Sequence, residues 1–174
     1  FFGCPVEVVT AETLAEVRPA LEAVAKGVAS GLHAAGFMAY EAASAFDGAL
    51  VTHPPGDIPL LWFGLYDGAS AQADRATGVY RVGDWEPLLS EQGYRKAVGR
   101  IRNLIADGDT YQANYTFPMQ APFDGDAHAW FRDLCEAQRA DHCAFVDTGR
   151  FAVLSASPEL FFRLTGSTLE TRPM

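Results

Sequence analysis

The sequence lacks the usual marks of metal-binding and secreted domains. Its three cysteines, Cys4, Cys135 and Cys143, include no Cys-x-x-Cys pair, so neither a zinc-ligand pattern nor a disulfide framework is indicated. An odd number of cysteines without a recognisable secretory segment predicts free thiols, buried in the core of a cytoplasmic protein. The four histidines are too scattered along the sequence to indicate a metal site.

Cations are scarce and long apolar runs are absent. Thirteen lysines and arginines face 22 acidic residues, for a formal net charge of −9, so binding to nucleic acid phosphates is not expected. No apolar run approaches the ~20 residues that cross a bilayer, and no membrane association is expected. With 49% hydrophobic and 20% charged residues, the 174-residue chain has the composition of a globular domain with a sizeable core.

The first third of the chain predicts a helix followed by strands. Thr10 can cap a helix that has Glu12 in its first turn, and apolar residues then recur at helical spacing from Leu14 to Val28. Pro19 lies inside this pattern and allows two interpretations. Either the helix kinks there, or a short helix ends and Pro19 opens a second one.

Two apolar segments follow. They are separated by Pro-Pro-Gly at residues 54–56, a sequence that interrupts regular secondary structure. Residues 36–45 are strand-like, and residues 58–66 form a continuous apolar run of strand length, typical of a strand buried on both faces. Residues 67–78 are small and polar, which predicts a surface loop, and a short strand is expected at 79–82.

The middle of the chain predicts two more helices. Ser90 can cap the first of them, Gly108 can end it in a left-handed conformation, and a strand is expected at 110–116. The other helix is expected at about 126–140. The side chains expected to be buried along these helices are Tyr94, Val98, Ile101 and Ile105 in the first, and Trp130, Phe131 and Leu134 in the second.

Two hairpins are predicted at the C-terminal end. Residues 143–146 and 151–154 flank the turn 147–150, and residues 160–164 and 168–171 flank the turn 165–167. Strand pairs that alternate with long helices predict an α+β fold, with mostly antiparallel sheets and flanking helices.

Glu159 is the main candidate for chemistry. It follows Ser157 and Pro158 and precedes an apolar run of three residues. A poorly hydrated carboxyl group at this place would serve as a general acid or base near neutral pH. The alternative is a structural glutamate that is salt-bridged at the start of a strand.

The motifs around Glu159 resemble those of a known family. The Ser-Pro-Glu triplet, the segment Glu-Thr-Arg-Pro-Met at 170–174 and the nonapeptide Gly-Asp-Thr-Tyr-Gln-Ala-Asn-Tyr-Thr at 108–116 are similar to those of the chorismate-utilising enzymes. This family includes component I of aminodeoxychorismate synthase and of anthranilate synthase. The resemblance implies that Glu159 is a catalytic acid or base, opposite a lysine expected directly after Met174.

The resemblance also implies the domain organisation and the reaction. Residues 1–174 would be the incomplete N-terminal part of one chorismate-binding synthase domain of this fold, without an internal linker. The whole protein would convert chorismate and ammonia to 4-amino-4-deoxychorismate, with Mg²⁺ as cofactor, its ligands outside residues 1–174, and a glutamine amidotransferase subunit as the ammonia source. The alternatives are anthranilate synthase component I, or a scaffold without turnover, and residues 1–174 alone are expected to be inactive.

Four further positions have expected roles as well. Gln112 and Asn114 are expected to hydrogen-bond neighbouring backbone, with a share in shaping the site as the alternative. Arg163 and Arg172 are expected to face solvent, with a place near a dicarboxylate substrate as the alternative.

At 141–143, Asp-His-Cys replaces a triplet that lines a tryptophan pocket in many family members, so tryptophan binding is not expected.

Overall fold

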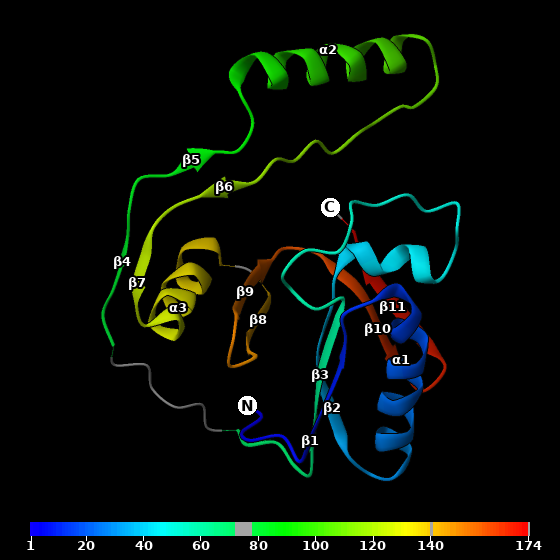
Figure 1. Ribbon diagram of the computed structural model, residues 1–174, viewed down its shortest axis with the longest axis vertical. Coiled ribbons are helices and arrows are strands. Elements are labelled where there is room, and N and C mark those ends of the chain that lie inside the picture. The colour runs from blue at the N-terminus through cyan, green and yellow to red at the C-terminus, as the bar shows by residue number, and fades with distance from the viewer. Residues whose placement is uncertain (72–77, 140, 174) are drawn as a thin grey trace. The chain divides into compact units, whose positions relative to one another are not determined.

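A computed structural model describes residues 1–71, 78–139 and 141–173 (Figure 1). Helices and antiparallel strand pairs make up this part of the chain, which confirms the α+β class. The chain forms two compact units, one of residues 1–76 with 131–174 and the other of residues 77–130. The N-terminal elements are β1 (Glu7–Ala11), α1 (Leu14–Ala29), β2 (His33–Met38), the 3₁₀-helix η1 (Tyr40–Ala45) and β3 (Leu61–Tyr66).

A three-stranded antiparallel sheet forms the best-buried part of the first unit. Its order is β1-β3-β2, so β3 lies in the centre and pairs with both neighbours. Most residues of β3 are buried, and Leu61 and Leu65 are among the largest fully buried side chains. The prediction of a doubly buried strand is therefore confirmed, with its bounds narrowed to Leu61–Tyr66.

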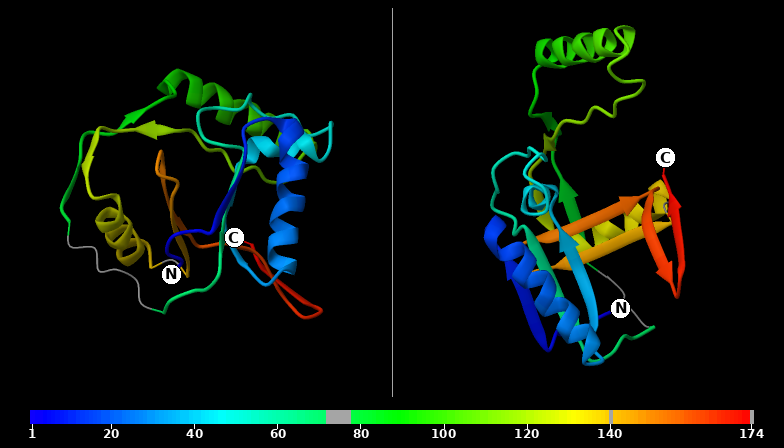
Figure 2. Two further views of the ribbon diagram at one scale, coloured as in Figure 1. Left: turned by 60° about the horizontal axis from the view of Figure 1, so that its bottom comes forward. Right: turned by 90° about the vertical axis from the view of Figure 1, so that its right-hand side faces the viewer.

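Helix α1 packs against this sheet and completes the core (Figures 1 and 2). The predicted cap at Thr10 is wrong, because Thr10 belongs to β1 and pairs with Trp62. The helix begins after Thr13, where the Glu16 carboxylate accepts the backbone N–H groups of Glu12 and Thr13 at 2.9 Å each. Both hydrogen bonds favour the charged carboxylate and lower the pKa of Glu16.

Pro19 lies within the single helix α1, so it does not open a second one. Residues 40–45, predicted as part of a strand, instead form η1, with Ala42 fully buried beneath α1. Arg18 joins the two elements. Its guanidinium donates to the carbonyl oxygens of Ala45 and Phe46 at 2.8 and 3.0 Å and lies 5.2 Å from the centre of the Phe46 ring.

The second unit is a strand ribbon that carries a helix at its end. Strands β4 (Tyr80–Val82) and β5 (Glu86–Pro87) lead into α2 (Glu91–Ala106), and β6 (Met119–Gln120) and β7 (Phe123–Gly125) return antiparallel to them (Figure 1). The centroids of three aromatic rings lie 5.1 to 6.3 Å from the centroid of the Trp130 ring, so four rings pack together at the base of the ribbon. They belong to Tyr80, Trp85, Phe123 and Trp130.

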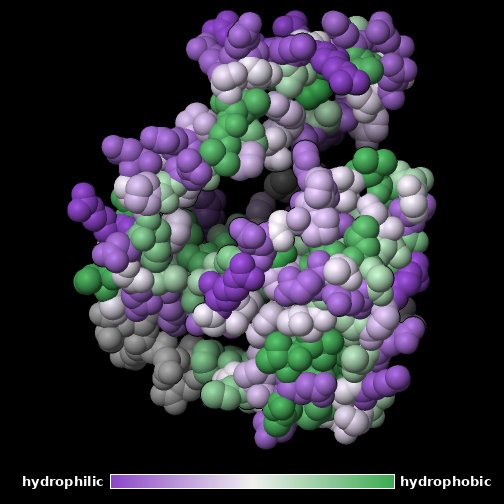
Figure 3. Space-filling view, viewed as in Figure 1, coloured by the Kyte–Doolittle hydropathy of each residue, from purple (hydrophilic) through white to green (hydrophobic). Residues whose placement is uncertain are grey.

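The ends of α2 follow the prediction, but its surroundings do not. Ser90 Oγ accepts the Gly93 N–H at 3.1 Å, and Gly108 has a φ of +83° just beyond the helix. None of its residues is buried, so the predicted buried stripe is wrong. An amphipathic pattern identifies an apolar face, but it does not supply the element that covers it. Hydrophilic side chains are prominent over α2 in Figure 3.

Residues 110–116 do not form the predicted strand. They include a bend at residue 111 and pair with no strand in the part of the chain that the structure describes. The alternation of polar and apolar residues satisfied the strand pattern. A strand also needs a hydrogen-bonding partner, and here the pattern alone gave the wrong result.

The C-terminal third of the chain contains α3 (Ala127–Gln138) and two hairpins. Asp126 caps α3 by accepting the His128 and Ala129 N–H groups, and the predicted end of the helix at residue 140 lies outside the described residues. Trp130, Phe131 and Leu134 are half-buried rather than buried. The hairpins, both confirmed, are β8 (His142–Asp147) with β9 (Ala152–Ser157) and β10 (Leu160–Thr165) with β11 (Thr168–Arg172).

Of the loop predicted at 67–78, residues 72–77 lie outside the described residues. The neighbouring residues 68–71 are exposed and belong to no helix or strand. A short strand follows as predicted, at β4.

Candidate functional site

Glu159 lies in the turn that connects the two C-terminal hairpins. Strand β9 ends at Ser157 and β10 begins at Leu160. The Ser157 hydroxyl accepts the backbone N–H of Glu159 at 3.1 Å and donates to its carbonyl oxygen at 3.2 Å. Pro158 restricts φ between the two residues. The triplet is therefore a locally stabilised turn that fixes the backbone of Glu159.

The Glu159 side chain is exposed. Within the described ranges, the structure gives its carboxylate neither an ion pair nor a hydrogen bond. The apolar residues that follow it do not enclose it either, since Phe161 is 82% exposed and Phe162 is 53% exposed. The salt-bridged alternative is thus not realised among these residues, and neither is the poorly hydrated environment that general acid catalysis would favour. The side chain is accessible to another molecule.

Arg163 and Arg172 are exposed, and both interact with Glu170. Arg163 Nη1 lies 3.4 Å from Glu170 Oε2, and the Arg172 guanidinium lies 2.7 Å from Glu170 Oε1. Such surface ion pairs contribute little to stability, typically ~0 to 1 kcal/mol. The three side chains form a solvent-facing network on β10 and β11, in which the Glu170 carboxylate pairs with both guanidinium groups.

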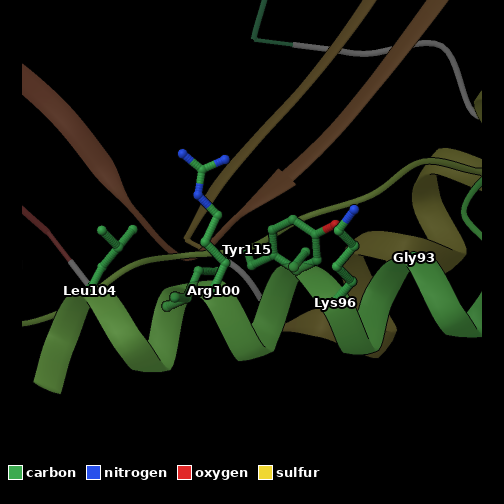
Figure 4. Close-up of a pocket in the computed structure, with 7 residues that line it drawn as sticks. Gly93, Lys96, Arg100, Leu104 and Tyr115 are labelled. Carbon is green, nitrogen blue, oxygen red and sulfur yellow. The ribbon is translucent and has the colours of Figure 1, made fainter.

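In the second unit, α2 and the segment after it line a shallow groove of about 440 Å³, shown in Figure 4. We call it the α2 groove. Lys96 and Tyr115 lie beside each other at the groove, while the Arg100 guanidinium extends away from the helix. Its lining consists of Gly93, Lys96, Ala97, Arg100, Ile101, Leu104 and Tyr115. The α2 groove thus combines an apolar floor with two cationic side chains.

The nonapeptide at 108–116 contributes Tyr115 to the α2 groove. Rings of Tyr115 and Phe117 pack on Tyr94 of α2, with centroids 5.9 and 5.8 Å away. Gln112 and Asn114 are both exposed. The Gln112 carbonyl accepts the Thr110 hydroxyl at 3.0 Å. The expected hydrogen bonds from the Gln112 and Asn114 side chains to neighbouring backbone are not seen among the described residues.

The prediction of buried thiols is wrong. Cys4 and Cys143 are exposed and Cys135 is half-buried. Cys135 of α3 is hydrogen-bonded to Cys143 of β8. Burial first, and then the interaction with Cys143, raise the pKa of the Cys135 thiol to about 11. This pairing was missed from the sequence, where a spacing of eight residues across a helix end and a strand start carries no recognised signal.

A metal centre is not evident in the part of the chain that the structure describes. Among the described residues, no group of three or more His, Cys, Asp or Glu side chains is placed to hold a metal ion. In the same ranges, no helix combines the length and the apolar character that a membrane span requires.

Comparison with known proteins gives matches along the chain. The model of a family described as chorismate binding enzyme matches residues 5–174. Aminodeoxychorismate synthase component 1 of Klebsiella aerogenes is 36% identical over 90 residues, which are 52% of this chain and 20% of that protein.

Two further relatives carry different names. Aminodeoxychorismate synthase of Streptomyces griseus is 36% identical over 97 residues, 55% of this chain and 13% of that protein. Anthranilate synthase component 1 of Thermus thermophilus is 29% identical over 101 residues, 58% of this chain and 21% of that protein. The matched part of the chain thus spans about a fifth or less of these relatives' length.

Proposed function

This chain belongs to the chorismate binding enzyme family, and from that premise we propose that its natural gene product converts chorismate and ammonia to 4-amino-4-deoxychorismate. The observation that carries the proposal is the family match over residues 5–174, which includes the turn that presents Glu159. Relatives named aminodeoxychorismate synthase, at up to 36% identity, favour this reaction within the family.

Glu159 is the proposed general acid. In the reaction a C–O bond at ring position 4 of chorismate breaks and a C–N bond forms. The hydroxyl leaves as water once it receives a proton, which the Glu159 carboxyl supplies, and the resulting carboxylate recovers a proton from the incoming nitrogen. The two hydrogen bonds between Ser157 and the Glu159 backbone support this role, because they hold the base of the side chain in place.

Mg²⁺ and a glutamine amidotransferase subunit remain part of the proposal. When bound, the ion would offset the negative charge of the chorismate carboxylates. Among the described residues, no group of three or more His, Cys, Asp or Glu side chains is placed to hold it. The subunit would release ammonia from glutamine. The name "component 1", which several relatives carry, supports the existence of a second component.

The test replaces Glu159 with glutamine in the natural gene product. Glu159→Gln removes the transferable proton and keeps the size of the side chain, so chorismate consumption with ammonia and Mg²⁺ should slow about 10²-fold or more. Glu22→Gln, at an exposed glutamate of α1, is the matched control and should retain nearly normal turnover. Circular dichroism establishes that both variants are folded. If Glu159→Gln turned over as fast as the control, Glu159 would have no catalytic role.

Anthranilate synthesis is the second candidate, supported by relatives of that name such as the one from Thermus thermophilus. Mass spectrometry of the product distinguishes the two, and anthranilate as the product would exclude the proposed reaction. The scaffold alternative has its own test. Residues 1–174 expressed alone are expected to consume no chorismate, and measurable turnover would contradict that expectation.

A further inference from the structure

Helix α3 and strand β8 pack with two matched pairs of side chains. The rings of Phe131 and Phe145 lie 5.6 Å apart between centroids. Cys135 is four residues after Phe131 on the helix, a rise of about 6 Å. Cys143 is two residues before Phe145 on the strand, a distance of about 6.6 Å along the same face. The two spacings match, so the aromatic contact places the thiols opposite each other.

The hydrogen bond between the two thiols agrees with this register. The two sulfurs differ in their surroundings: Cys143 is exposed to solvent, whereas Cys135 is half-buried against it. Because the raised pKa keeps Cys135 protonated at neutral pH, attack on a soluble reagent falls to the exposed Cys143. Cys4 lies on the N-terminal segment before β1, also exposed, and serves as an internal comparison.

We propose that Cys135 and Cys143 are a reversible dithiol–disulfide pair that reacts with small-molecule disulfides such as oxidised glutathione. The Cys143 thiolate attacks one sulfur of the reagent, forms a mixed disulfide and releases one reduced thiol. Cys135 then loses its proton to solvent and attacks the Cys143 sulfur, which expels the second reduced thiol. Two protein thiols are oxidised to one disulfide, and one small disulfide is reduced to two thiols.

The disulfide would link α3 covalently to the hairpin that ends at the Glu159 turn. Cys143 pairs with Ala156 in the β8–β9 ladder, and Ser157 follows directly. The oxidised form would therefore restrain the strand that precedes Ser157. The proposal itself concerns the thiols and stands whether or not Glu159 is catalytic.

The experiment treats the natural gene product with oxidised glutathione, blocks the remaining thiols with iodoacetamide and digests with trypsin. Arg132, Arg139 and Arg150 are cleavage sites that place the two cysteines in separate peptides, residues 133–139 and 140–150. We expect these two peptides to be joined by a disulfide and to separate on treatment with dithiothreitol.

Three variants identify the attacking sulfur. In Cys135→Ser, Cys143 should accumulate as the glutathione adduct, because the second thiol is missing. In Cys143→Ser, Cys135 should stay free of glutathione, and in Cys4→Ser the linked peptides should form as in the wild type. The wild-type digest decides the proposal even if a variant fails to fold. Recovery of both peptides separately, alkylated or each carrying glutathione, would overturn it.

Discussion

Gly27 of α1 should resist replacement by alanine, although alanine is the better helix former. A Cβ at Gly27 would lie 2.6 Å from Leu65 Cδ1, and the three heavy atoms nearest to it all belong to the Leu65 side chain. Leu65 is 1% exposed at the centre of the sheet, so its side chain has little room to move away. The glycine therefore allows close approach of α1 to β3.

Two opposing effects decide whether Gly27→Ala raises or lowers the free energy of unfolding. Replacing glycine with alanine inside a helix raises the free energy of unfolding by about 1 kcal/mol. Overpacking a filled core costs about 1–3 kcal/mol. The free energy of unfolding of Gly27→Ala should thus fall by about 1 kcal/mol. In a Leu65→Ala background, which itself costs about 3–5 kcal/mol, the collision is absent and the same substitution should stabilise by about 1 kcal/mol.

Urea denaturation followed by circular dichroism on the four proteins of this double-mutant cycle measures both effects. Gly99 of α2 is the control, because a Cβ there would meet nothing within 4 Å. Gly99→Ala should be neutral or stabilising. If Gly27→Ala destabilised equally with and without the Leu65 side chain, the contact would not be the reason for the glycine.

Three other substitutions test separate contacts. Arg18→Lys should lower the free energy of unfolding by about 1 kcal/mol in urea denaturation, because lysine cannot make both hydrogen bonds to the end of η1; an unchanged midpoint would contradict this. Ser90→Ala removes the α2 cap and should cost about 1 kcal/mol of helix stability, seen as faster amide exchange in the first turn of α2. Burial raises the pKa of the Tyr66 phenol above its ordinary 10.0, so its contribution to stability is full below pH 10 and is lost as pH rises beyond it. Tyr66→Phe should reduce the alkaline loss of stability, whereas the control Tyr111→Phe, at a side chain that is 90% exposed, should not.

Local signals in the sequence predicted local structure well. The two C-terminal hairpins form as expected because short turns with Gly149 and Gly166 at positive φ connect adjacent strands. The Ser90 cap and the Gly108 stop likewise depend on a few neighbouring residues. The cap of α1 is local too, but the prediction placed it at Thr10, whereas the helix is capped at Thr13, where Glu16 three residues later completes the capping box.

Features that depend on distant residues could not be predicted. The apolar face of α2 and the alternation at 110–116 are both real patterns, but neither specifies what covers or pairs with it. The same holds at the candidate site. The turn that holds Glu159 is local and was recognisable, whereas the environment of its carboxyl depends on what packs around it. The contact between Cys135 and Cys143 arises from the packing of α3 on β8, which no short motif encodes.

The strand order β1-β3-β2 determines when the three-stranded sheet can form during synthesis of the chain. Both outer strands depend on Leu61–Tyr66 for their hydrogen bonds, so neither can pair until that segment has left the ribosome. Until then α1 can form only as an isolated helix, because there is no sheet to cover its apolar side. More than 50 further residues must be translated after β1 before β3 is complete. A pause in translation after the segment Leu61–Tyr66 has left the ribosome should therefore help this protein reach its native state more than an equal pause before residue 60 has been added.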